Sequence, residues 1–235
     1  MKSSELRGFL TGLILGDGSI DLGVRKRSFN IKSTNKDFID YIKDSIDSVS
    51  TFSASIRHIP EHYSCGCHHK EAWEYRIKAH PYFSKLYHYF YDDYRHRKIY
   101  AKTLSWLNPS GLANWYMSDG YVCLVGKTKG EIRSRRIDFC TDRYYKEDVE
   151  LIAEYLYNKF NLNVSIIKRN NTYRIRIKKE SYEDFINLIS PYVIPSMKYK
   201  LYLGYKNKPI WMSEEFWEKQ NCLKSAFALT SNVEG

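Results

Sequence analysis

The pattern of apolar and polar residues predicts the same order of strands and helices twice along the chain. Strict alternation of polar and apolar residues predicts strands at 28–33, 75–78, 136–141 and 173–178. Helices are predicted at 36–49, 80–91, 145–160 and 181–190. Because a short apolar stretch also begins each half, the pattern predicts an α+β protein built from two αββαββα units.

These two apolar stretches end in the same way. Residues 10–18 read Leu-Thr-Gly-Leu-Ile-Leu-Gly-Asp-Gly, and residues 112–120 read Leu-Ala-Asn-Trp-Tyr-Met-Ser-Asp-Gly. Each stretch is predicted to be a helix that stops at a glycine in a left-handed turn, at Gly18 and Gly120. Asn108-Pro109-Ser110 is the predicted joint between the halves, with Ser110 as the candidate cap of the second helix.

Acidic and basic residues repeat in the same register. Asp17 and Asp119 are 119 − 17 = 102 residues apart, and Lys98 and Lys200, which close the two halves, are 200 − 98 = 102 residues apart. A shared offset indicates a duplicated unit. The predicted division is an N-terminal half, a C-terminal half and an unmatched extension, at 1–105, 106–207 and 208–235.

The composition favours a polyanionic partner. Lys and Arg number 37 and Asp and Glu 27, which gives a net charge of +10. No apolar run approaches the roughly 20 residues that cross a bilayer, so no membrane association is expected. The five cysteines are irregularly spaced, which argues against a disulfide framework and for a reducing compartment.

One cluster of metal-ligating residue types lies in the first half. It comprises His62, Cys65, Cys67, His68 and His69. The Cys-x-Cys spacing departs from the usual zinc pattern and no partner pair is evident, so a hairpin near DNA is the favoured interpretation. The sequence shows no Ser-His-Asp set, no P-loop and no dinucleotide fingerprint.

Together these motifs resemble the LAGLIDADG homing endonucleases of the single-chain, two-motif type. Residues 10–18 fit the nine-residue motif and residues 112–120 fit its Leu-Ala-x-Trp-x-Met-x-Asp-Gly variant. Segments 73–98 and 194–201 resemble further family segments, so the likeness covers about residues 5–202. The departures from the motif are Leu15, Asn114 and Ser118, and both aspartates are present. The resemblance implies two motif helices on a pseudo-two-fold axis and two antiparallel sheets that form a DNA-binding saddle.

The resemblance also implies a site between the halves. Asp17 and Asp119 are expected to bind Mg²⁺, with Mn²⁺ as a substitute, and the adjacent Gly16 and Ser118 are assigned to the same metal site. Oxygen ligands and retained waters suit this hard cation. Lys98 and Lys200 match the basic residues that the family places beside the metals, where they would stabilise charge on the phosphate.

Basic residues on alternate strand positions predict the DNA-binding face. In 174–178 every second residue is basic and isoleucines occupy the other face. Such a face can contact phosphates and base edges. The predicted DNA-binding residues are Arg25, Arg27, Asn30, Lys32, Arg76, Lys78, Lys127, Lys129, Arg133, Arg135, Arg174, Arg176 and Lys178.

The expected function is therefore that of a monomeric homing endonuclease. It would cleave a long, asymmetric site in double-stranded DNA by metal-dependent phosphodiester hydrolysis. Two alternatives stay open: an intron RNA maturase, and a non-cleaving DNA-binding regulator on the same scaffold. The expected location is intracellular, in a bacterial or phage-infected cytoplasm or in an organelle, and the sequence does not choose among these.

Overall fold

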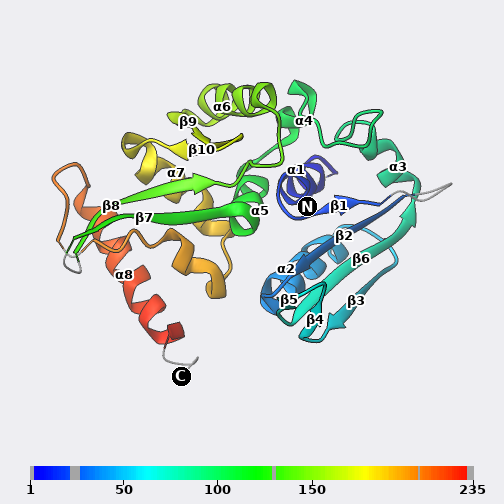
Figure 1. Ribbon diagram of the computed structural model, residues 1–235, viewed down its shortest axis with the longest axis horizontal. Helices are drawn as coiled ribbons and strands as arrows, with labels where there is room; N and C mark the ends of the chain where they lie inside the picture. Colours follow the sequence, from blue (N-terminus) through cyan, green and yellow to red (C-terminus); the bar gives the residue numbers. More distant parts are fainter. Residues whose placement is uncertain (1–2, 22–26, 129–130, 206, 232–235) are drawn as a thin grey trace.

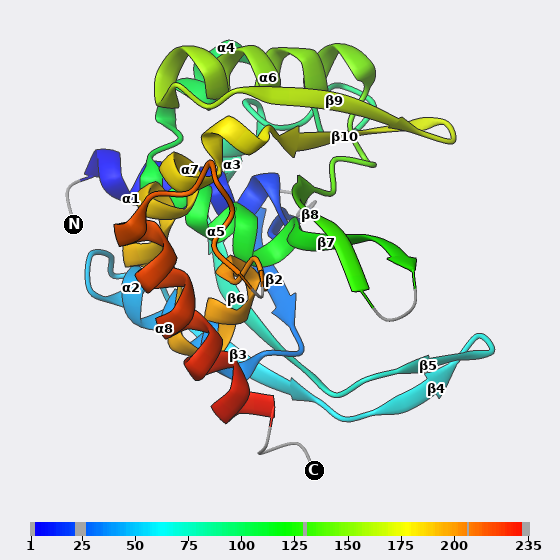
Figure 2. The same ribbon diagram turned by 90° about the vertical axis from the view of Figure 1, so that its left-hand side faces the viewer.

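The computed structural model describes residues 3–21, 27–128, 131–205 and 207–231, and it shows two similar α+β halves side by side (Figure 1). The first half contains α1 (Ser3–Leu15), β1 (Ser19–Ile20), β2 (Arg27–Ser33), α2 (Lys36–Asp47), β3 (Ala54–Ile59), β6 (Ala72–His80) and α3 (Pro81–Tyr87). Its sheet is antiparallel with strand order β1-β2-β6-β3. The short strands β4 (His62–Ser64) and β5 (Cys67–His69) form a hairpin that projects beyond this sheet (Figure 2).

The second half repeats this plan. It contains α5 (Pro109–Asp119), β7 (Gly120–Thr128), β8 (Glu131–Phe139), α6 (Lys146–Phe160), β9 (Val164–Arg169), β10 (Thr172–Ile177) and α7 (Tyr182–Ile189). The strand order β7-β8-β10-β9 matches that of the first sheet. The predicted duplicated αββαββα fold is confirmed.

Five further segments connect or follow the repeated elements. Helix α4 (Ala101–Trp106) joins the halves, and the 3₁₀ segments are η1 (Lys179–Ser181), η2 (Ser190–Tyr192) and η3 (Pro195–Leu201). Helix α8 (Glu214–Ser231) has no counterpart in the first half and packs against η3. In the part of the chain that the structure describes, no helix is both long and apolar enough to cross a bilayer.

Each sheet buries one face against helices, as the alternation predicts. Ile175 and Ile177 on β10 are fully buried, whereas Arg174 and Arg176 between them carry partly exposed side chains. In the first half the buried residue Ile77 on β6 adjoins Arg76, which points away from the core. The apolar face packs on the helices because a strand directs alternate side chains to opposite faces.

The start of α5 differs from the predicted cap. Asn108, not Ser110, is the N-cap: its Oδ1 accepts a hydrogen bond from the Gly111 amide at 2.8 Å, and the Ser110 hydroxyl donates to the same oxygen at 2.9 Å. Pro109 takes the first helical position, where its fixed φ and missing amide proton cost nothing. The residue before the proline therefore becomes the cap.

The two motif helices pack in parallel through glycines. A Cβ added to Gly12 of α1 would lie under 3.0 Å from backbone atoms of Gly111 at the start of α5. One added to Gly8 would lie 2.5 Å from the Asn108 side chain and 2.6 Å from the Trp106 carbonyl oxygen, and one added to Gly16 would lie 2.5 Å from the Cβ of Ser118. Because residues four apart share one helical face, these three glycines form a continuous contact strip. Gly16 faces Ser118 in this contact, and Gly8 and Gly111 also take part.

The glycines after the motif aspartates have a different role from the predicted one. Neither Gly18 nor Gly120 is among the positive-φ glycines, and Gly120 is extended with φ −85° and ψ 150°. They are required because of crowding: a Cβ would collide with the Tyr116 ring at Gly120 and with the Leu13 carbonyl at Gly18. The predicted left-handed turns were wrong.

We expect Gly12→Ala to destabilise the protein by at least about 2 kcal/mol, because its methyl group would force the two helix backbones apart. Urea unfolding monitored by circular dichroism measures the change. Glu154→Ala, on the exposed face of α6, is the control and should change stability by less than about 0.5 kcal/mol. Equal stability of the two variants would contradict the close helix contact.

Candidate active site

The two motif aspartates meet at the C-terminal ends of α1 and α5. Asp17 follows α1 and Asp119 is the last residue of α5. A single guanidinium, that of Arg143, lies 3.8 Å from an oxygen of Asp17 and 3.9 Å from an oxygen of Asp119. One side chain can approach both carboxylates only if the two halves deliver them to the same place.

Asp119 occupies the more buried position of the pair. Its side chain is 11% exposed and that of Asp17 is 46% exposed. Burial, and secondarily the negative charge of Asp17, raise the pKa of Asp119 to about 6, against the opposing effects of Arg143, Arg97 and Lys200. The Oδ2 atom of Asp119 is buried without a hydrogen-bond partner among the described groups. A buried, unpartnered carboxylate oxygen beside a second carboxylate is an arrangement that a cation stabilises.

Arg97 holds the end of α1. Its guanidinium donates hydrogen bonds to the carbonyls of Ile14, Gly16 and Gly18 at 2.7, 2.7 and 2.6 Å. The last carbonyls of a helix have no intrahelical partner, so this side chain satisfies them and fixes the chain that carries Asp17.

Two residues that follow β8 support the same turn. Arg143 donates to the Gly16 carbonyl at 3.1 Å, and the Tyr144 hydroxyl donates to the Leu15 carbonyl at 2.9 Å. Both belong to the second half, so the second half also fixes the end of the first motif helix. The sequence interpretation missed Arg97, Arg143 and Tyr144, because their spacing carries no motif.

Lys200 lies beside the carboxylates. Its ammonium donates to the Met117 carbonyl, and the Tyr116 hydroxyl donates to the carbonyl of Lys200 at 2.8 Å. Burial lowers the pKa of Lys200, while Asp17 and Asp119 raise it. The structure therefore brings together three of the four predicted catalytic residues.

The C-terminal extension supports the segment that carries Lys200. Gln220 on α8 is buried; its Oε1 accepts from the Leu203 amide at 2.8 Å and its Nε2 donates to the Leu201 carbonyl at 3.3 Å. Phe216 and Leu223, also on α8, are buried next to this segment. The extension thus completes the core behind the site.

Lys98, the fourth predicted catalytic residue, lies elsewhere. It is exposed, its ammonium is 5.8 Å from the centre of the Tyr100 ring, and its charge acts on Asp148. The neighbouring Arg97 instead occupies the place that corresponds to Lys200, since each contacts the terminal carbonyls of the motif helix in its own half. The 102-residue offset aligned Lys98 with Lys200, but the local path of the chain turns Arg97 inward.

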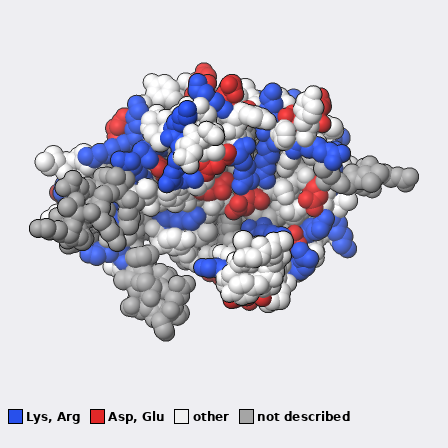
Figure 3. Space-filling model, in the orientation of Figure 1, with Lys and Arg blue, Asp and Glu red and all other residues white. Residues whose placement is uncertain are grey.

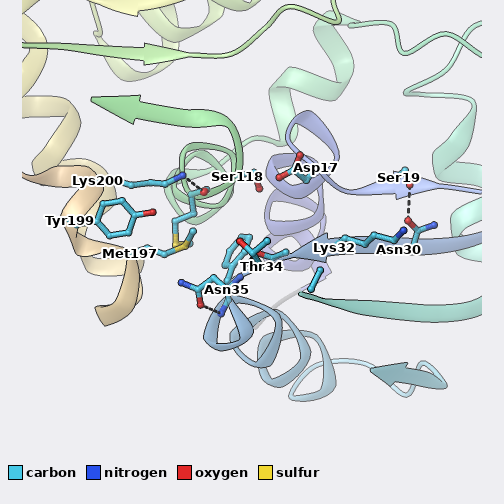
Figure 4. Close-up of a pocket in the computed structure, with 14 residues that line it drawn as sticks. Asp17, Ser19, Asn30, Lys32, Thr34, Asn35, Ser118, Met197, Tyr199 and Lys200 are labelled. Atoms are coloured by element: carbon cyan, nitrogen blue, oxygen red, sulfur yellow. Dashed lines mark hydrogen bonds between the residues drawn. The ribbon is translucent and has the colours of Figure 1, made fainter. Parts of the chain in front are cut away.

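An open pocket of about 620 Å³ adjoins the carboxylates. Asp17, Ser118 and Lys200 line its inner end, and Asn30 and Lys32 on β2 line another side (Figure 4). In the space-filling view, acidic side chains gather near the middle of the face and Lys and Arg surround them (Figure 3). A polyanion that follows the basic rim would cross the carboxylates.

Arginines of the predicted DNA face are held by acidic neighbours. Arg174 donates to Asp142 through Nε at 2.9 Å and to the Tyr121 hydroxyl at 2.9 Å. Arg176 forms a two-point contact with Asp138 at 2.7 and 2.8 Å. In the first sheet, Arg76 pairs with Asp21 at 2.9 Å. Such fork contacts fix the orientation of a guanidinium, so these arginines are partly neutralised but ordered.

The other predicted DNA-binding residues differ in their contacts and in their exposure to solvent. The Ser19 hydroxyl donates to Asn30 at 2.9 Å, the Arg27 guanidinium lies over the Tyr87 ring, and Arg135 donates to the Gly204 carbonyl at 3.1 Å. Lys32, Lys78 and Lys178 are exposed. Arg25 and Lys129, and the side chains of Lys127 and Arg133, lie outside the described part of the chain.

The residues around the carboxylates fit a cation only in part. Within the described ranges, no group of three or more His, Cys, Asp or Glu residues could hold a metal, and this includes the β4–β5 hairpin. A cation at the centre would therefore depend on Asp17 and Asp119 with backbone oxygens and water. The carbonyl of Gly16 already accepts from Arg97 and Arg143, and the Ser118 hydroxyl donates to Asn114 within α5. The Oδ2 of Asp119, which accepts no hydrogen bond among the described groups and lies 3.9 Å from Arg143, is the clearest candidate ligand.

All five cysteines are free, as the sequence predicted. The rings of His62 and His69 stack across the β4–β5 hairpin at 4.9 Å, and His68 pairs with Glu61. These contacts explain the cluster as cross-strand pairing in an exposed hairpin.

Comparison with known proteins assigns the class. Residues 7–185 match the model of the LAGLIDADG DNA endonuclease family, so the chain belongs to this family. It is 32% identical over 196 residues to a protein of Wickerhamomyces canadensis described as probable intron-encoded endonuclease 1, which covers 82% of this chain and 81% of that protein. It is also 37% identical over 108 residues to the cytochrome b mRNA maturase bI2 of Saccharomyces cerevisiae, which covers 44% of this chain and 23% of the maturase.

A solved structure shows the same arrangement. The homing endonuclease I-WcaI bound to its DNA recognition sequence superposes with a TM-score of 0.72 at 29% identity, over 86% of this chain and 88% of that one. The chain is thus a homing endonuclease of the LAGLIDADG type with both motifs in one polypeptide.

The charge of Asp119 should reduce stability at neutral pH. Its folded pKa of about 6 exceeds the ordinary value of 3.8, so the folded protein binds more protons than the unfolded chain between these values. The contribution of Asp119 to the free energy of unfolding therefore falls as the pH rises from about 4 to 6, and it stays low above pH 6. In EDTA at pH 7.5, Asp119→Asn should raise the unfolding free energy by about 1–3 kcal/mol, measured by urea unfolding.

At pH 4 this gain should largely vanish, because the parent carboxyl is then neutral in the folded state. Asp184→Asn, an exposed position on α7, should show no comparable gain at pH 7.5. A gain at pH 7.5 that is equal in the two variants would contradict the raised pKa of Asp119.

Arg97 and Lys98 are adjacent residues with different expected roles. Arg97→Ala leaves several helix-end carbonyls without a donor and should cost about 2–3 kcal/mol of stability. It should also lower DNA cleavage by at least about tenfold, as expected for a residue that orients a ligand. Lys98→Ala should change stability by less than about 0.5 kcal/mol and leave the cleavage rate close to that of the parent. The reverse ranking would restore Lys98 as the catalytic residue.

Proposed function

We propose that this protein cleaves both strands of duplex DNA at a long, asymmetric sequence by Mg²⁺-dependent hydrolysis of phosphodiester bonds, with Mn²⁺ able to substitute. The observation that carries the proposal is the meeting of Asp17 and Asp119 around Arg143, next to Lys200. The I-WcaI structure, whose DNA is its recognition sequence, supports the duplex as substrate.

The chain's own residues would share the chemistry as follows. Asp17 and Asp119 would hold a divalent cation, which when bound supplies an activated water and charge neutralisation at the leaving oxygen. Lys200, half enclosed and with a lowered pKa, would hydrogen-bond a phosphate oxygen and oppose the negative charge that grows there. Arg143, which lies 3.8 Å from Asp17 and 3.9 Å from Asp119, would add a second positive charge beside the carboxylates.

One copy of the chain could carry out the proposed cleavage. Each half contributes one carboxylate and one sheet, and the two sheets carry different side chains, for example Asn30 and Lys32 in one and Arg174 and Arg176 in the other. Two unlike half-sites can therefore be read by a monomer. Its place of action would be intracellular, where its DNA substrate is found.

A second role in RNA splicing is the alternative that the comparisons favour, since a maturase is among the relatives. The maturase match covers less than half of this chain. Cleavage of DNA and assistance to an intron do not exclude each other, so a splicing assay with the cleavage-deficient variants would separate the two roles.

Cleavage of a randomised duplex library with Mg²⁺ should identify one long site. Asp17→Asn and Asp119→Asn should each reduce cleavage of that site below detection, because the amide removes the negative charge that holds the cation. Gel-shift affinity for the same duplex should change by less than about threefold, since neither aspartate lies on the strands of the basic face.

Asp40→Asn, on the exposed face of α2, is the matched control and should cut like the parent. EDTA should abolish cleavage by the parent. Undiminished cleavage by either motif variant, with the protein folded, would refute the assignment of the site.

A further inference from the structure

A second pocket is lined by residues of α1, of α3 and the turn that follows it, and of α4. Its volume is about 540 Å³. Three aromatic and three basic side chains make up most of its lining: Tyr82, Tyr89, Trp106, Arg7, Lys85 and Lys102. We infer that this pocket binds single-stranded nucleic acid at a site separate from the duplex groove.

The aromatic rings form an ordered platform. Tyr89 and Trp106 meet edge to face with ring centres 5.1 Å apart. The Arg7 guanidinium lies 5.0 Å from the centre of the Trp106 ring, and the Lys102 ammonium lies 4.8 Å from that of Tyr89. All three rings are half-buried, so part of each ring is accessible from the pocket. Unpaired bases stack on such rings, whereas bases inside a duplex already stack on each other.

The basic side chains of this pocket have fewer acidic partners than those of the predicted DNA-binding face. Arg76, Arg174 and Arg176 each have an acidic partner. By contrast, no Asp or Glu is among the described side chains that line this pocket, and Lys85 and Lys102 are exposed. Free cations beside aromatic rings suit a ligand with both phosphates and bases.

The position of the pocket leaves the duplex groove open. Arg7 precedes Asp17 by ten residues, which corresponds to about 15 Å along a helix. The pocket therefore lies toward the opposite end of α1 from the carboxylates. A single strand bound there would not displace a duplex bound across Asp17 and Asp119.

A basic aromatic cluster on α6 borders the same helix α4. The Lys159 ammonium donates to the Ser105 carbonyl of α4 at 3.0 Å and lies 5.2 Å from the centre of the Tyr155 ring. The Tyr155 hydroxyl is buried without a hydrogen-bond partner among the described groups. This cluster places a further lysine and a further aromatic ring next to α4, outside the lining of the pocket.

Fluorescence anisotropy with a labelled 12-nucleotide oligouridylate, and with oligothymidylate of the same length, tests the inference. The full chain is first mixed with excess non-specific duplex DNA to occupy the groove. We expect the oligonucleotide to bind under this condition, with an affinity that falls as salt rises. Stronger binding of oligouridylate would assign RNA as the ligand, and equal binding would assign any single strand; both results support the pocket.

Two sets of variants locate the binding. Lys85→Gln with Lys102→Gln should weaken oligonucleotide binding by at least about tenfold, and Tyr89→Leu should weaken it by about fivefold or more. Tyr89→Phe keeps the ring and should bind within about twofold of the parent. The matched control, Lys43→Gln with Lys224→Gln, removes two lysines from α2 and α8 and should bind like the parent.

Duplex cleavage should be unchanged in the Lys85/Lys102 variant, which separates this inference from the proposed nuclease function. Complete displacement of the oligonucleotide by duplex would place the strand in the groove and overturn the inference. Equal loss in the control pair would do so as well. Binding of an acidic peptide such as hexaglutamate, without binding of either oligonucleotide, would assign the pocket to a protein partner instead.

Discussion

The contact between α1 and α5 is the constraint on which the site depends. Gly8, Gly12 and Gly16 bring the two helix backbones so close that a methyl group at these positions would overlap the partner. The helices run parallel and end together, so each delivers an aspartate to the same point. The two carboxylates then repel each other, and the protein offsets this with Arg143, Lys200 and Arg97. The packing of the two helices therefore brings two negative charges together, and a bound cation would relieve their repulsion.

The second half supports the motif helix of the first half. The end of α1 is held by Arg97 from its own half and by Arg143 and Tyr144 from the second half. The segment that carries Lys200 is held by α8, which the first half lacks. The duplication is thus symmetric in its sheets and motif helices but not in its supports. This asymmetry explains why an arginine in one half takes the place of a lysine in the other.

The outer faces of the two sheets carry basic side chains, and several of these side chains are held in a fixed orientation. Arginines on β6 and β10 are paired with acids on the strands or in the loops that follow them, which lowers the net charge of the face but fixes the direction of each guanidinium. Fixed donors suit the reading of a defined sequence, and unpaired lysines suit binding to phosphates of any sequence. The pocket near Arg7 resembles the unpaired lysines in this respect, because no Asp or Glu is among the described side chains that line it.

Local pattern determined the duplicated order of helices and strands, the buried faces of β6 and β10, and the matching register of Asp17 and Asp119, whereas the family resemblance implied that the two aspartates meet. The first three features depend on residue spacing along one segment or on register between two copies, and both are written in the sequence. Tertiary structure decided the cap at Asn108, the extended backbone at Gly120, the contact of Arg97 rather than Lys98 with the end of α1, and the positions of Arg143 and Gln220. Those features depend on which side chain reaches a carbonyl or carboxylate of a distant segment, and no spacing rule within a single segment contains that information.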